Sequence, residues 1–435
     1  MDYTPCVIVP GIGQSKMELL DSNGKKIKMA WQLDVDTDAV IKKLKFPMLR
    51  SVIFRSDMGL SKRMGEVVRD IVDPIAVNPD GSMKNNVRVV EYPQSLAECT
   101  EDERGYIYRM VPVQHLSHII GEENMYFFAF NSFGQPYKIA ADLDAFIKKI
   151  KAKHNCKKVN LIPISLGGAM SIAYLDAYGY GDVKRIMYFV PALQGTPIIS
   201  SLIDMDIDIG NALSLVRFMF PRSTADMLEK VLGLIPKKVG EKLIKSAFAA
   251  LNEAVVAPCG AMWATVPPEK YTPLAEKFLI DEKYASLKEQ TDRFYKAQAA
   301  FPENVKKMKA DGVEFFAVVG YGLQLMPIVK TDLNSDGVIN TSSASLGAEL
   351  APLGKTLENA DENSDYISPD KIIDASKSIL PDTVWYFKDQ FHDGIAYNDT
   401  ALNVAAKILS DDSFNSVYSD PAYPRFGVKQ DNRKK

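Results

Sequence analysis

The segment from residue 157 to residue 178, KKVNLIPISLGGAMSIAYLDAY, places the strongest constraint on how this chain can fold. An apolar run from Val159 to Ile164 is followed by Ser165, a leucine, two glycines and apolar positions at helical spacing. This order predicts a β-strand that turns sharply into a helix, with the serine hydroxyl above the positive end of the helix dipole. The two glycines would let helix and strand cross closely, because a Cβ there would collide. We interpret Ser165 as a nucleophile. The alternative is a solvated serine in an ordinary turn, since Pro163 replaces the first glycine of the G-x-S-x-G pattern.

Strand-like and helical patterns alternate along most of the chain. Apolar residues recur at helical spacing in Ala140–Lys153 and Asp399–Leu409. This alternation predicts a mostly parallel, doubly wound α/β sheet with helices on both faces. The tail after Phe426 has no such pattern and is expected to lack regular structure. The strand-like runs are Cys6–Pro10, Val87–Glu91, Met125–Phe130, Lys158–Ile164, Arg185–Val190, Val313–Tyr321 and Thr383–Lys388.

Two long stretches interrupt the alternation and predict insertions. Residues 16–120 hold short, mixed elements, whereas residues 198–310 are helical and amphipathic, with lysines opposite the apolar positions. The second stretch separates two strands of the sheet, which is where a cap or lid is inserted. The predicted division is a core of residues 1–197 and 311–435, with a helical cap of residues 198–310. The alternative is that these apolar faces only pack on the core.

The composition argues against some classes of function. A net charge of −3 and a pI near 6.0 give no general attraction for nucleic acid, and no nucleic-acid-binding motif is present. No run of 18 apolar residues occurs, so we expect no membrane-spanning helix. No signal-peptide pattern is visible, which makes the cytoplasm the default expectation, although a secreted mature chain would read the same way. The four cysteines are scattered and are expected to be small buried residues.

A serine nucleophile needs a general base and an acid that orients the base. In a doubly wound hydrolase the order is serine, acid, and then histidine after the last strand. Of the four histidines only His392 has this position, because the others (His115, His118 and His154) precede the serine. The acid should come from the loop IVKTDLNSDGVINTSSA, which offers Asp332 and Asp336. We prefer Asp336, because its Asp-Gly turn can present the carboxylate.

The same acidic loop matches the first half of a calcium-binding loop. Asp332, Asn334 and Asp336 hold the spacing of the first three ligands, and a glycine follows them. The loop's last position, which requires a bidentate acid, is Ser343. A second run with the same carboxylate spacing, at residues 361–365, lacks the glycine. We therefore predict no metal site and keep a calcium-binding interaction module as an alternative.

Acyl transfer also requires two N–H donors for the negative charge that develops on the substrate oxygen. The residue after the nucleophile, Leu166, supplies one of them in this pattern. The other should come from the turn after the first strand, VIVPGIGQS, where Gly11 and Gly13 allow the backbone to approach a substrate. Ile12 is the predicted second donor. The alternative is a plain Pro-Gly turn.

In their order along the chain, these motifs resemble the lecithin:cholesterol acyltransferase-like branch of the α/β-hydrolases. The resemblance implies an α/β-hydrolase fold with a helical cap, and it places Ser165, Asp336 and His392 as nucleophile, acid and base. It also implies Ile12 and Leu166 as oxyanion donors. The segments that carry it are VIVPGIGQSKMELL, FFAFNSFGQPYKIAADLDAFIKKIK, VNLIPISLGG, VPALQGTP, PCGAMWATVPP, SDGVIN and His392.

Within the resemblance, PCGAMWATVPP is similar to a cap segment of that family, and Trp263 is the expected substrate contact. The sequence departs from the family at Ile164, where histidine is common, and at Pro163, where a small residue is usual. It departs again at Asn131-Ser132, where an acidic and aromatic pair is usual. These differences bear on substrate preference more than on the chemistry.

The resemblance implies an enzyme that acts on acyl esters of lipids, by hydrolysis or by transfer to an alcohol, without a cofactor. A second hypothesis is a hydrolase-like binding protein that keeps the fold without the chemistry. The expected partner is a lipid or other ester, with peripheral contact to a membrane surface as a separate hypothesis. For that surface the alternative is a solvated basic helix end. The residues on which the membrane-contact hypothesis depends are Leu44, Phe46, Met48, Leu49 and Phe54, interleaved with Lys42, Lys43, Lys45, Arg50 and Arg55.

Overall fold

The structure is a computed structural model that describes residues 3–31, 35–111, 113–219, 226, 229–230, 232–361 and 363–429. At its centre lies a seven-stranded sheet whose paired strands all run parallel. The predicted parallel sheet is therefore confirmed. In spatial order the strands are β14 (Phe426–Val428), β13 (Val384–Lys388), β8 (Glu314–Tyr321), β7 (Val183–Phe189), β6 (Val159–Pro163), β1 (Cys6–Val9) and β5 (Met125–Phe127).

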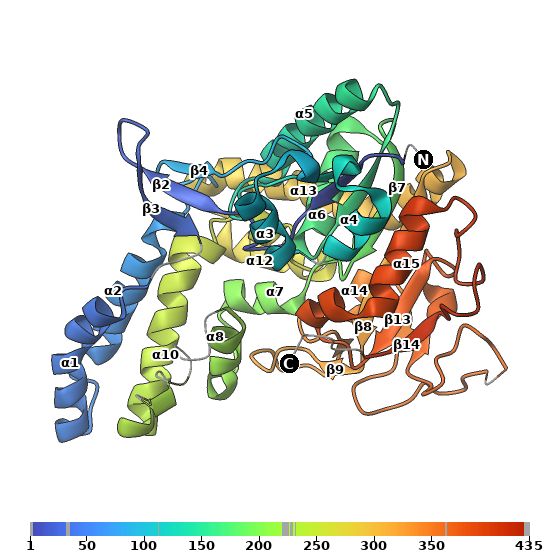
Figure 1. Cartoon of the computed structure of the whole chain (residues 1–435). Coiled ribbons are helices and arrows are strands. Elements are labelled where there is room, and N and C mark those ends of the chain that lie inside the picture. The colour runs from blue at the N-terminus through green and yellow to red at the C-terminus, as the bar shows by residue number, and fades with distance from the viewer. Residues whose placement is uncertain are drawn as a thin grey trace.

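Each face of the sheet has its own buried core, because successive side chains of a strand point to opposite faces. Val7 and Leu161 belong to one core, and Ile8 and Ile162 belong to the other. Burial on both faces explains why these strands read as nearly continuous apolar runs. Helices α5 (Pro136–His154), α6 (Leu166–Tyr178) and α13 (Ala285–Ala310) cover the first face, and α3 (Glu101–Met110), α4 (Gln114–Ile120) and α15 (Asp399–Ser410) cover the second (Figure 1).

Two sequence-based expectations about strands are wrong. The run Val87–Glu91 does not enter the main sheet, because its residues Val87–Val89 form β4 in a separate antiparallel sheet with β2 (Met17–Leu20) and β3 (Lys26–Trp31). The main sheet instead takes β14 from the tail that was expected to lack structure, of which residues 430–435 lie outside the described range. A three-residue edge strand carries too few side chains to show a period, and its pairing with β13 is a tertiary contact.

An arm projects from the body of the molecule at the left of Figure 1. It consists of α1 (Thr37–Phe54) and α2 (Leu60–Val72), which follow the small sheet, and of α10 (Lys237–Leu251), which packs against α2. No helix in the described part of the chain combines the length and apolarity needed to cross a membrane. Further helices described between β7 and β8 are α7 (Pro197–Asp204), α8 (Leu213–Met219), α11 (Gly260–Trp263) and α12 (Pro268–Phe278).

The proposed division into core and cap stays a prediction. One helix that it assigned to the cap, α13, packs against α5 and α6 over the sheet. Short elements follow β8 and lead toward the last strand: β9 (Leu323–Gln324), β10 (Asn334–Ser335), α14 (Thr341–Ala344), β11 (Glu349–Leu350) and β12 (Ile373–Asp374).

The chain order and spatial order of the strands define the fold class. β6, in the middle of the sheet, leads into Ser165, and β8 and β13 lie on one side of it in the order in which the acid and the histidine follow along the chain. A parallel sheet with helices on both faces and this order of serine, acid and histidine is the α/β-hydrolase architecture. The predicted fold is confirmed.

Candidate active site

Ser165 occupies a strained turn between β6 and α6. Its backbone dihedral angles are φ 52° and ψ −115°, a conformation that residues with a side chain rarely adopt. Its neighbours hold it there: the Ser165 N–H donates to the carbonyl of Phe189 at 3.0 Å, and the Ser165 carbonyl accepts from Ala192 N–H at 3.0 Å. A serine on a strained strand-to-helix turn is the geometry of a nucleophile elbow.

The two glycines after Leu166 are required by close packing, as predicted. A Cβ at Gly167 would overlap the carbonyl oxygen of Val9 on the neighbouring strand β1. A Cβ at Gly168 would lie 2.8 Å from the Cβ of Pro191, in the segment after β7. Helix α6 can therefore begin directly against the ends of both neighbouring strands, which fixes the position of Ser165.

The structure brings Ser165, His392 and Asp336 into one hydrogen-bonded chain. His392 Nε2 lies 3.0 Å from Ser165 Oγ, and His392 Nδ1 lies 2.7 Å from Asp336 Oδ2. The three side chains come from different strand ends and are all buried. Hydroxyl, imidazole and carboxylate in this order form the arrangement by which a base can accept the serine proton.

The carboxylate of Asp336 is held by its own loop. Its Oδ1 accepts the N–H groups of Val338 at 2.9 Å and Ile339 at 2.7 Å, which leaves Oδ2 for His392. The His392 N–H also donates to the Asp336 carbonyl at 2.9 Å. The imidazole is therefore oriented by both the side chain and the backbone of Asp336.

Most of the side-chain oxygens that the calcium-binding alternative needs as ligands already accept hydrogen bonds from the protein. Both carboxylate oxygens of Asp336 accept hydrogen bonds, and Asn334 Oδ1 accepts from the N–H of Gly322 at 2.7 Å. Asp332 is exposed, whereas Asn334 and Asp336 are buried. Among the described residues, no group of three or more histidine, cysteine or acidic side chains is placed to hold a metal ion.

The charge state of His392 depends on two opposing effects. Burial of the imidazole lowers its pKa, but the negative charge of Asp336 and the hydrogen bond to it outweigh burial. The pKa of His392 is therefore raised above its ordinary value of 6.5. Two other histidines have different partners: His115 Nε2 lies 2.7 Å from Asn403 Oδ1, and His154 Nε2 lies 2.8 Å from the hydroxyl of Tyr126.

The predicted oxyanion donors, Ile12 and Leu166, lie on the two segments that meet at the serine. A Cβ at Gly11 would be 3.0 Å from the Cβ of Ser165, so the turn after β1 lies directly against the nucleophile. Leu166 is the first residue of α6, where the N–H has no partner within the helix. Within the described ranges, neither N–H donates a hydrogen bond to the protein. Their role as oxyanion donors stays a prediction.

Sequence reasoning missed Gln14, which braces the turn after β1. Its Oε1 accepts the N–H of Gly11 at 2.5 Å, and its Nε2 donates to the carbonyl of Met110 at 2.8 Å. The hydroxyl of Tyr106 donates to the Gln14 carbonyl at 3.1 Å. No local pattern marks this glutamine, because Met110 and Tyr106, which hold it against the turn, are 96 and 92 residues away along the chain.

Trp31 and Ser132 hold the other side of the same turn. Trp31 Nε1 donates to the Gly13 carbonyl at 3.1 Å, and the Gly13 N–H donates to Ser132 Oγ at 3.3 Å. Gly13 has a φ of 74°, and a Cβ there would lie 2.9 Å from Trp31 Nε1, so both backbone and space favour glycine. Ser132, which departs from the family pattern, thus has a structural partner in this chain.

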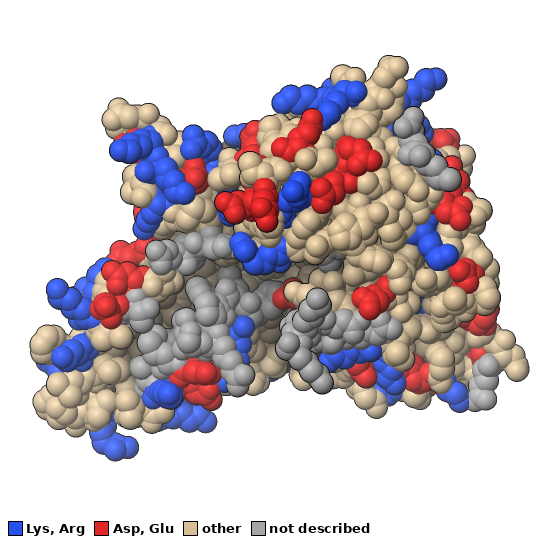
Figure 2. All heavy atoms as spheres, in the orientation of Figure 1, with Lys and Arg blue, Asp and Glu red and all other residues tan. Residues whose placement is uncertain are grey.

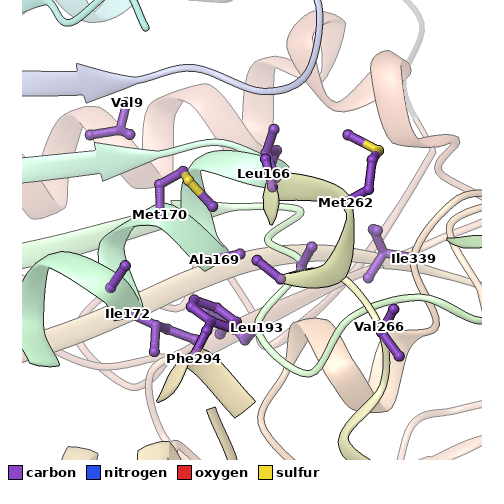
Figure 3. Close-up of a cluster of buried hydrophobic side chains, with 14 of the residues drawn as sticks. Val9, Leu166, Ala169, Met170, Ile172, Leu193, Met262, Val266, Phe294 and Ile339 are labelled. Carbon is purple, nitrogen blue, oxygen red and sulfur yellow. The ribbon is translucent and has the colours of Figure 1, made fainter. Parts of the chain in front are cut away.

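Trp263 lies in the buried core, where its exposed fraction is 2%. Its Nε1 donates to the carbonyl of Ala257 at 2.7 Å, and its ring centroid lies 5.9 Å from that of Tyr271 in a T-shaped arrangement. Its neighbour Met262 belongs to the same buried apolar cluster as Leu166, Ala169, Leu193 and Phe294 (Figure 3). Contact between Trp263 and a substrate stays a prediction.

Comparisons with known proteins found only distant structural similarities. No family model matches the chain, and no curated protein matches its sequence. A phospholipase, PlaB from Legionella pneumophila, is similar at 13% identity and a TM-score of 0.29, over 59% of this chain and 43% of its own. The Tle4-Tli4 complex matches at 11% identity and a TM-score of 0.32, over 85% of this chain and 83% of that chain. A lipase-esterase related protein from Clostridium acetobutylicum ATCC 824 matches at 12% identity and a TM-score of 0.18, over 42% of this chain and 88% of its own.

These named structures include a phospholipase and a lipase-esterase related protein, and the present chain spans less than half the length of PlaB. At such low identities and TM-scores these similarities carry no argument about this chain. The assignment to the α/β-hydrolases therefore depends on the sheet order and on the serine turn. The narrower lecithin:cholesterol acyltransferase-like resemblance stays a prediction.

Proposed function

We propose that this protein is a serine hydrolase that cleaves carboxylic ester bonds of lipids through an acyl-enzyme. The observation that carries the proposal is the hydrogen-bonded chain from Ser165 through His392 to Asp336. His392 Nε2 takes the proton of the Ser165 hydroxyl as the oxygen attacks the acyl carbon. Asp336 keeps the other imidazole proton on Nδ1 and stabilises the imidazolium that forms.

The tetrahedral intermediate then collapses toward the acyl-enzyme. Its oxyanion is stabilised by the N–H groups of Ile12 and Leu166, which lie on the two segments against Ser165. The imidazolium of His392 gives its proton to the leaving alcohol, and the acyl group stays on Ser165 Oγ. Water, or an acceptor alcohol as in the acyltransferase-like branch, then attacks the acyl carbon with His392 again as base. No cofactor is needed for these steps.

A series of p-nitrophenyl esters of increasing acyl length tests the proposal. We expect turnover that rises with chain length from acetate to longer acyl groups, because the apolar surroundings of the serine favour apolar acyl chains. A fluorophosphonate probe should label the protein at Ser165 and abolish this turnover. An unlabelled, inactive protein would instead support the hydrolase-like binding protein.

The raised pKa of His392 predicts how activity depends on pH. Only the neutral imidazole can accept the serine proton, so kcat/KM should fall as the pH drops through the pKa of His392 in the free enzyme. Because Asp336 raises this pKa, the acid limb should have its midpoint above 6.5. The measurement is kcat/KM against pH for a soluble short-chain ester. A midpoint clearly below 6.5 would contradict the assignment of the base.

A further inference from the structure

Helix α1, the outer helix of the arm, is apolar on two opposite faces. Its inner face packs Leu44 and Met48 against the arm's small core. That core consists of buried residues of α2, of α10 and of the segment that precedes α10: Leu60, Met64, Ile235, Val239 and Leu243. This packing accounts for one apolar face of α1 and leaves the opposite face without a partner in the arm.

The opposite face exposes a stripe of large apolar side chains. Phe46, Leu49 and Ile53 follow one another at i, i+3 and i+7, which places them along one side of the helix. Their exposed fractions are 71%, 52% and 62%. Further large apolar side chains that are exposed nearby on the arm are Ile41, Val52, Phe54 and Met58. A stripe of exposed large apolar side chains along one helix, as at Phe46, Leu49 and Ile53, is typical of an interaction surface.

Basic side chains flank the stripe. Lys42, Lys45 and Arg50 are exposed and form no ion pair within the described part of the chain, whereas Lys43 is paired with Asp70 at 2.6 Å. The only acidic residue of α1 is Asp38, in its first turn. Figure 2 shows basic side chains spread among uncharged ones over the end of the arm. Since the whole chain has a net charge of −3, this positive charge is a local property of the arm.

We propose that this face of α1 docks onto an anionic lipid surface. Phe46, Leu49 and Ile53 would enter the boundary between headgroups and acyl chains, while Lys42, Lys45 and Arg50 extend to the lipid phosphates. A second copy of the chain fits this face less well, because a two-fold contact would bring the same cations together. An anionic bilayer satisfies both the apolar stripe and the charges beside it.

The arm belongs to segments that are inserted at the same edge of the sheet as the active site. α1 and α2 belong to the segment inserted after the carboxyl end of β1, and α10 belongs to the segment inserted after β7. The carboxyl ends of these parallel strands form the edge that also carries Ser165 and His392. In Figure 1 the arm projects away from the end of the sheet where β1 begins. Docking itself requires no turnover, so it can be tested apart from the proposed chemistry.

Vesicle flotation with the full chain tests the proposal. The vesicles are phosphatidylcholine alone, and phosphatidylcholine with one third phosphatidylglycerol, at low and high salt. One variant carries Phe46→Gln, Leu49→Gln and Ile53→Gln, and a second carries Lys42→Gln, Lys45→Gln and Arg50→Gln. A matched control carries Ile27→Gln and Ile280→Gln, which replace apolar residues that are 60% and 78% exposed away from α1. Glutamine keeps the helix propensity, and circular dichroism confirms that each variant is folded.

We expect the wild-type chain and the control to float with the anionic vesicles and to dissociate at high salt. Loss of the cations should weaken binding about five-fold per residue and roughly 100-fold for all three. Loss of the apolar stripe should weaken binding by at least about ten-fold. Equal binding by wild type and the stripe variant, or no flotation of the wild type, would overturn the proposal. So would a dimer in lipid-free buffer that the stripe variant abolishes.

Discussion

Replacing Ser165 with alanine should abolish ester turnover and leave the fold intact. We expect kcat for a p-nitrophenyl ester to fall by about 10⁶-fold, because Ser165 is the only hydroxyl that the imidazole of His392 contacts among the described residues. The substitution removes only the Ser165 hydroxyl, with its one hydrogen bond to His392, and alanine retains the Cβ. The melting temperature should therefore change by less than about 3 °C. Initial rates and a thermal melt of the same preparation give both quantities.

The matched control for this substitution is Ser171→Ala, in the same helix. Ser171 is fully buried, and its hydroxyl has partners of its own, the carbonyl of Gly168 at 2.6 Å and the hydroxyl of Tyr188 at 3.2 Å. Its loss should leave kcat within a few-fold of wild type. If Ser165→Ala retained more than about one percent of the wild-type rate, another nucleophile would have to be sought.

Replacing Asp336 with asparagine should lower kcat by about 10⁴-fold without removing a side chain from the site. The amide oxygen of asparagine can still accept the N–H groups of Val338 and Ile339. Its NH₂ group would then face His392 Nδ1 and donate to it, which forces the imidazole proton onto Nε2. In that tautomer Nε2 cannot accept the proton of Ser165.

Asp332→Asn is the control for this prediction, because it makes the same chemical change in the same loop at an exposed position. We expect it to leave kcat unchanged. The pair of variants also tests the calcium alternative: a calcium-dependent rise in melting temperature that Asp332→Asn removes would favour a metal site. Full activity in Asp336→Asn would show that the acid of the site lies elsewhere.

The mixed insertion of residues 16–120 has a structural role at the site that its sequence does not reveal. Trp31, Tyr106 and the carbonyl of Met110 all hold the turn of residues 11–14. This turn must keep its shape while charge develops on the substrate oxygen, because preorganised donors stabilise that charge most effectively. The insertion therefore surrounds the turn that carries the predicted donor Ile12.

The sequence by itself determined the features that depend on local order. The apolar run before Ser165 and the glycines after it specify a strand, a tight turn and a helix, because a period of two and a period of 3.6 are properties of neighbouring residues. Ser165 came from this strand-turn-helix pattern, and the order of serine, acid and histidine along the chain then selected His392. That order left Asp332 and Asp336 as candidates for the acid, and the Asp-Gly turn favoured Asp336. The fold class followed from the same alternation of strands and helices.

Only the tertiary structure decided which strands join the main sheet, what holds the turn after β1, and which face of α1 is buried. β14, the separate sheet that holds β4, and the contacts of Gln14 are each fixed by partners distant along the chain. Both faces of α1 are apolar, so the sequence does not distinguish the face that is buried from the face that is exposed. The packing of α2 and α10 against α1 determined which of them is buried. Long-range packing chooses between surfaces that local chemistry makes equivalent, because burial depends on which partner occupies the adjacent space.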